Sequence, residues 1–118
     1  MIFGEKIGDI DYKLRLGIYG IVIDKDKLEY ILNAIYDYEE LFGMKVLSAE
    51  YKPREREVHI KTERNFVVWL DTSITLEKQY DKLKKATADL NIYTENLEYI
   101  DLRISSANGD RVIFKRRK

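Results

Sequence analysis

The stretch that decides the fold is EYIDLRISSANGDRVIFK, residues 98–115. Its first part alternates apolar and polar residues, as an antiparallel strand with one buried face does. The apolar positions are Ile100, Leu102 and Ile104. Asn108-Gly109 follows, a strong hairpin signal because type I′ turns need two residues at positive φ. We therefore predict a hairpin with strands over 98–104 and 111–115, and its longer connection leaves the turn type open.

Apolar residues at steps of three and four predict a helix over 28–42 upstream of this hairpin. Gly43 stands where a left-handed residue commonly ends a helix. Asp24 or Asp26 is the predicted N-terminal cap, with Glu29 completing a capping box after Asp26.

A second helix is predicted over residues 76–90, capped by Thr72 or Ser73. Its apolar stripe is narrow, and four lysines are expected to stay on the outside. These are Lys78, Lys82, Lys84 and Lys85.

Further strands are predicted at 13–23, 44–51, 56–61 and 66–70. The last of these, Phe66 to Leu70, is apolar on both faces, which indicates a central strand. The whole pattern predicts one α+β domain over residues 1–118. We expect a mixed, mainly antiparallel sheet of five to seven strands, with two helices packed on one face and an edge β-hairpin at the end.

Composition narrows the classes of function. The 118 residues hold 21 basic and 21 acidic side chains, so no global field attracts nucleic acid or an anionic membrane. Cysteine is absent, which excludes disulfides and thiolate chemistry. No apolar run approaches roughly 20 residues and no signal peptide is recognisable, so the chain as written is expected to be soluble and not exported. It is either a domain of a longer protein or a chain without an anchor.

Candidate catalytic groups are few. His59 is the only histidine, and we expect it to be exposed and without a structural role. Glu55 and Glu57 alternate on a short strand and are expected to be solvated. We therefore predict no catalytic residue, no cofactor, no metal and no small-molecule substrate.

Aromatic residues are the more unusual feature of the composition. Tyr51, Trp69, Tyr99 and Phe114 lie on predicted strands, where several could share one sheet face. If no helix covers that face, it is either a protein interface or a stacking platform for single-stranded nucleic acid. A small nucleic-acid-binding α+β module is thus the alternative function, although the neutral net charge counts against nucleic acid as a partner.

The motif Tyr99-Ile100-Asp101-Leu102-Arg103, followed by a polar turn and an apolar strand near a basic end, resembles the C-terminal part of the FtsQ/DivIB family of bacterial cell division proteins. The helix over 76–90 and the strand pair over 58–70 resemble the segments that precede the motif in that family. Residues 16–20 and the first helix stand where the family's β domain begins. The resemblance implies that the chain is this β domain.

The same resemblance implies a non-catalytic scaffold domain of the division machinery. In that family the last strands bind a small coiled-coil membrane protein of the FtsB/DivIC type, which adds a strand to the sheet edge. The residues implied to bind this partner are Arg103, Ile104, Arg111, Val112, Ile113, Phe114 and Lys115.

Family members also carry a cytoplasmic tail, one transmembrane helix and a POTRA domain upstream, which this chain lacks. The implied location is the outer face of the cytoplasmic membrane if an anchored protein contains this domain, and otherwise the cytoplasm. Membrane contact is expected only through a segment absent here. For Arg103, an ion pair with Asp101 on the same strand face remains the alternative to partner binding.

Overall fold

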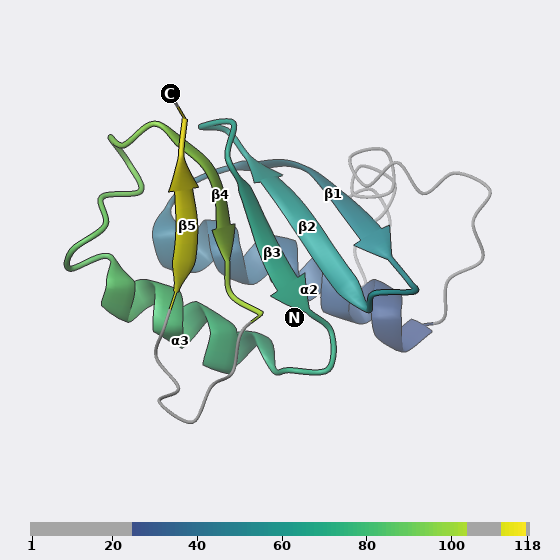
Figure 1. The fold of residues 1–118 in the computed structure, drawn as a ribbon. Coiled ribbons are helices and arrows are strands. Elements are labelled where there is room, and N and C mark those ends of the chain that lie inside the picture. Colours follow the sequence, from purple (N-terminus) through teal and green to yellow (C-terminus); the bar gives the residue numbers. More distant parts are fainter. Residues whose placement is uncertain (1–24, 104–111, 118) are drawn as a thin grey trace.

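The computed structural model describes residues 25–103 and 112–117. Two helices and five strands lie in this part of the chain (Figure 1). The helices are α2 (Lys25–Phe42) and α3 (Leu76–Ala86), and the strands are β1 (Val46–Lys52), β2 (Glu57–Thr62), β3 (Val67–Asp71), β4 (Leu97–Asp101) and β5 (Ile113–Arg116).

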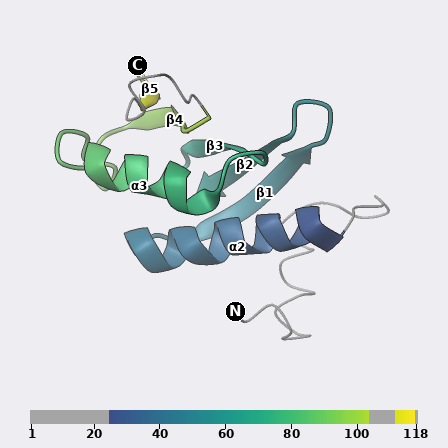
Figure 2. The ribbon, with the colours of Figure 1, turned by 90° about the horizontal axis from the view of Figure 1, so that it is seen from below.

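The strands form one sheet in the order β1-β2-β3-β4-β5. Only β3 and β4 run parallel, and α3 is the crossover that joins them, as parallel neighbours require. Figure 2 shows α2 and α3 on the same side of the sheet. The predicted α+β architecture is confirmed: the sheet is mixed and mainly antiparallel, helices cover one face, and β5 pairs with β4 at one end of the strand order.

The boundaries of the strands differ from the predicted ones by a few residues. The strands predicted at 44–51, 56–61 and 66–70 each begin one or two residues later. In the final hairpin the first strand ends at Asp101 rather than at residue 104. The predicted strand over 13–23 and the Asn108-Gly109 turn lie outside the described residues.

The α2 helix forms because its apolar residues make one face, and that face is buried against the sheet. Ile31, Ile35 and Tyr38 are fully buried. Gly43 ends the helix at φ +63°, donating its backbone N–H to the carbonyl oxygen of Glu39, as predicted. Asp26 lies in the first turn rather than at the cap, and Asp24 lies outside the described residues.

The α3 helix begins at Leu76, as predicted, but its N-terminal cap is a different residue from the predicted one. Thr75 is the N-cap, and its hydroxyl accepts a hydrogen bond from the backbone N–H of Lys78. Thr72 and Ser73 belong instead to the turn after β3, where Asp71 accepts hydrogen bonds from Ser73. The prediction of a cap at Thr72 or Ser73 was therefore wrong, because the Asp71 carboxylate binds Ser73 and the Arg56 carbonyl oxygen binds Thr72.

The core lies between the helices and the inner sheet face. Tyr38 and Tyr80 are fully buried there, and each hydroxyl has a partner: Tyr80 donates to the Ala34 carbonyl at 2.6 Å. Tyr30 lies at the edge of the core, where burial raises its pKa to about 12. Neither α2 nor α3 combines the length and apolar character needed to cross a bilayer.

Candidate functional site

Arg103, the last residue of the recognised motif, is the centre of an ion-pair cluster on the sheet face opposite the helices. Its guanidinium donates to both oxygens of Asp101, at 2.9 and 2.8 Å. A third hydrogen bond reaches the Glu57 carboxylate on β2. The guanidinium also lies 5.0 Å from the Trp69 ring centroid. The structure therefore shows the ion pair that was the alternative for Arg103, extended to a second acid.

Electrostatics stabilise this cluster in its charged form. Burial alone would raise the pKa of Asp101, but the hydrogen bonds and positive charge of Arg103 lower it overall. Hydrogen bonding to Asp101 in turn raises the pKa of Arg103. Because the Asp101 and Glu57 side chains are only 6% and 14% exposed, loss of Arg103 would leave two poorly solvated acids without their cation.

Three aromatic rings stack across the same face. Trp69 on β3 lies between His59 on β2 and Tyr99 on β4, with centroid distances of 5.2 and 4.2 Å and interplanar angles of 14° and 6°. His59 also bonds Glu57 at 2.9 Å, and its side chain is 15% exposed. The expectations of an exposed, idle His59 and a solvated Glu57 were wrong, because the neighbouring strands bring Trp69 and Arg103 against them.

The expected shared aromatic face is only partly present. Trp69 and Tyr99 share the face away from the helices, whereas Tyr51 and Phe114 pack toward the core. Each face of the Trp69 ring is already occupied by a neighbouring ring, since its partners lie on strands to either side. A nucleobase needs a free ring face on which to stack.

Lys82 holds the end of β4 from the helix side. Its ammonium donates to the Leu102 carbonyl at 2.9 Å, and the residue is 5% exposed. The expectation that Lys82 stays outside was wrong, because the chain leaving β4 needs a donor for this carbonyl. With Arg103 on one face and Lys82 on the other, the segment from Asp101 to Arg103 is fixed from both sides.

The β5 strand has a different character. The backbone N–H of Leu102 donates to the carbonyl oxygen of Trp69 on β3. Because the backbone N–H and C=O groups of successive strand residues point to opposite sides, those of Asp101 and Tyr99 point toward β5. The register pairs these two residues with Ile113 and Lys115.

By the same alternation, the backbone groups of Val112 and Phe114 point away from β4. Among the described strands, none pairs with β5 on that outer side. In the described part of the chain, β5 is therefore an edge strand with outward backbone donors and acceptors.

Side chains fasten β5 to the domain at its C-terminal end. Lys115 pairs with Glu98 at 3.6 Å, and Arg116 pairs with Glu95 at 2.5 Å. Arg117 donates to the carbonyls of Leu97 and Asn65. The basic end of the chain is thus used within the fold and keeps the strand in register.

The residues expected to bind a partner fall into three groups. Val112, Ile113, Phe114 and Lys115 lie on or next to the outer strand. Arg103 lies in the ion-pair cluster, and Ile104 and Arg111 lie outside the described residues. Sequence reasoning missed Glu57 and Lys82 as structural partners. The signal for Glu57 was its position two residues before His59 on one strand face, although strand order was needed to bring it to Arg103.

No three histidine, aspartate or glutamate side chains of the described segments gather as a metal site. No family model matches the chain, and no curated protein matches it.

Proposed function

We propose that this domain is a non-catalytic protein-interaction module that binds its partner by β-strand addition to β5. The observation that carries the proposal is the outward direction of the Val112 and Phe114 backbone groups at the end of the sheet. Strand addition needs such groups together with a rigid strand that presents them. The contacts of Lys115, Arg116 and Arg117 supply that rigidity.

The resemblance of the motif over 99–103 to the FtsQ/DivIB family suggests the identity of the partner. We propose a coiled-coil division protein of the FtsB/DivIC type, and a scaffold role in bacterial cell division. A short extended segment of that partner would pair antiparallel or parallel to β5 and continue the sheet as a sixth strand. Ile113, which is 38% exposed on the face away from the helices, would contact its side chains.

Nucleic-acid binding is the weaker proposal. The Trp69 ring is covered on both faces, and Arg103 is already engaged by two carboxylates. Binding to a single-stranded oligonucleotide would fall steeply with added salt, whereas strand addition would not.

Proline substitution tests the strand-addition proposal. Phe114→Pro removes an outward donor and leaves the ladder to β4 intact, so the domain should stay folded while partner binding is lost. Phe114→Ala is the matched control, because it also removes the ring but keeps the backbone N–H. Ile113→Pro interrupts the ladder itself and should lower both Tm and affinity.

Binding would be measured by calorimetry with the soluble region of the FtsB/DivIC-type protein of the same organism. Equal affinity of the Phe114→Pro and Phe114→Ala variants would contradict strand addition at β5. If this protein binds neither the unchanged domain nor the two variants, the proposed partner is wrong.

A further inference from the structure

A pocket lies beside β5, on the helix side of the sheet. It has a volume of about 310 Å³ and is lined by Lys85, Ala86, Asp89, Leu90, Val112 and Phe114. One wall is therefore the C-terminal part of α3 and the chain just after it, and the other wall is the outer strand. At the lower end of the range for ligand pockets, this volume suits a single side chain better than a cofactor.

The pocket lies directly beside the outer strand, β5, and side chains on and next to that strand line it. Val112 and Phe114, whose backbone groups point outward, turn their side chains toward the core and line this pocket. A strand added beside β5 would run about 4.8 Å away, and its side chains would alternate between the two faces. One helix-facing side chain of that strand would therefore meet the pocket.

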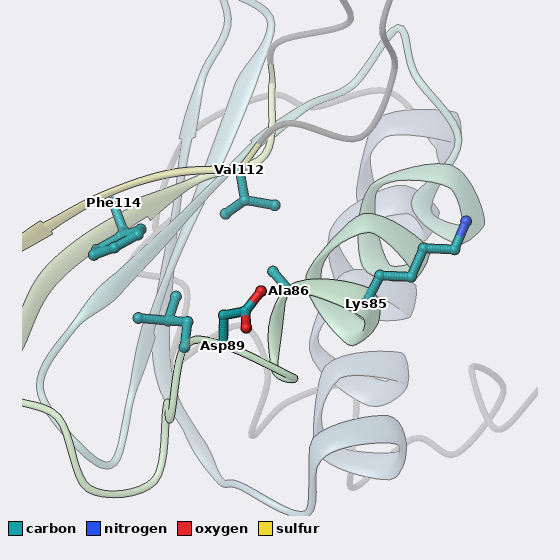
Figure 3. Close-up of a pocket in the computed structure, with 6 residues that line it drawn as sticks. Lys85, Ala86, Asp89, Val112 and Phe114 are labelled. Carbon is teal, nitrogen blue, oxygen red and sulfur yellow. The ribbon is translucent and has the colours of Figure 1, made fainter.

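The lining combines apolar surface with charged side chains, and its acidic group is Asp89. Ala86, Leu90, Val112 and Phe114 supply the apolar surface. Asp89 forms no ion pair with any residue in the described ranges, and Figure 3 shows it beside Ala86 and beneath Val112.

The nearby cations are engaged elsewhere. Lys85 pairs with Asp81 at 3.2 Å, and in Figure 3 its side chain extends away from Val112 and Phe114. Arg116, which lies 4.8 Å from the Phe114 ring centroid, pairs with Glu95. Among the described residues, the carboxylate of Asp89 is therefore the lining charge without an ion-pair partner.

We propose that this pocket receives an arginine or lysine side chain of the partner strand, with its aliphatic stem on the apolar lining and its charged end at Asp89. This inference rests on the proposed strand addition and adds to it a chemical requirement on the partner. Long cationic side chains place their methylene groups on apolar surface in this way while the charge stays near water. Asp89 would then be the specificity-determining residue of the interaction.

Small-molecule probes test the pocket without the partner. Butylguanidinium has the stem and charge of arginine, butylurea is a neutral molecule of similar shape, and pentanoate is an anionic one. Titrations of the ¹⁵N-labelled domain should show butylguanidinium shifting the backbone signals of residues 85–90 and 112–114. It should bind about two- to fivefold more tightly than butylurea, as one exposed charge pair allows, and pentanoate should bind more weakly still.

Two variants make the result specific. Asp89→Asn should abolish the preference for butylguanidinium, whereas Glu77→Gln, which neutralises an acid in the first turn of α3, should leave it unchanged. Equal binding of butylguanidinium and butylurea to the unchanged domain, or shifts away from the pocket, would overturn the proposal. Because these probes do not use backbone pairing, that failure is distinct from failure of the proline test.

Discussion

The middle of the sheet and its β5 end use polar groups in opposite ways. On the face of β2, β3 and β4 opposite the helices, every charged group of the ion-pair cluster has a partner. The rings of His59, Trp69 and Tyr99 stack on one another there. Along β5 the side chains are fastened, but alternate backbone groups point outward. The comparison indicates that the conspicuous residues of the motif pair with one another within the sheet, whereas the outward backbone groups of β5 have no strand partner among the described residues.

Charge reversal at Arg103, in the ion-pair cluster, is expected to have the largest effect on stability. Arg103→Glu places a third acid beside Asp101 and Glu57, so the free energy of unfolding should fall by about 3 kcal/mol or more. Chemical denaturation measures this change, with Arg54→Glu in an exposed turn as the matched control. This expectation replaces the one that the resemblance implies, that Arg103 contacts a partner. Unchanged stability together with lost partner binding would restore the interface role.

The pH dependence of stability also tests the ion-pair cluster, through Asp101. Because folding lowers the pKa of Asp101 below its ordinary value, the folded state favours the charged carboxylate. That contribution is fully present above the unfolded pKa and is lost as the pH falls through the lower folded pKa. Urea unfolding from about pH 7 to about pH 3 should therefore show the stability advantage over an Asp101→Asn variant shrinking below about pH 4. A constant difference across this range would mean that the charge of Asp101 contributes nothing.

The smallest effect is expected on the β5 side. Glu98→Gln breaks a pair with Lys115 in which both side chains are about half exposed, so stability should change by less than about 0.5 kcal/mol. Thermal unfolding compares it with the Arg103→Glu variant. A loss as large as that at Arg103 would show that this exposed pair matters as much to the fold as the ion-pair cluster of Arg103.

The sequence predicted the fold well because period-two and helical patterns report burial, and burial is local to each element. Ile100 and Leu102 were expected inward and are fully buried. The candidate site was less predictable, because it depends on which strands become neighbours. Glu57 lies 46 positions from Arg103 and meets it only through the order β2-β3-β4. Lys82 looked like an exposed helix lysine, and only the position of the Leu102 carbonyl explains its burial.

Amide hydrogen exchange along β5 tests the central claim most directly. In the free domain the Phe114 amide should exchange rapidly while those of Ile113 and Lys115, which face β4, are protected. Addition of the proposed FtsB/DivIC-type partner should protect Phe114 and leave its neighbours unchanged. Protection of Phe114 in the free domain would contradict the account, because the edge proposed for strand addition would then already be paired.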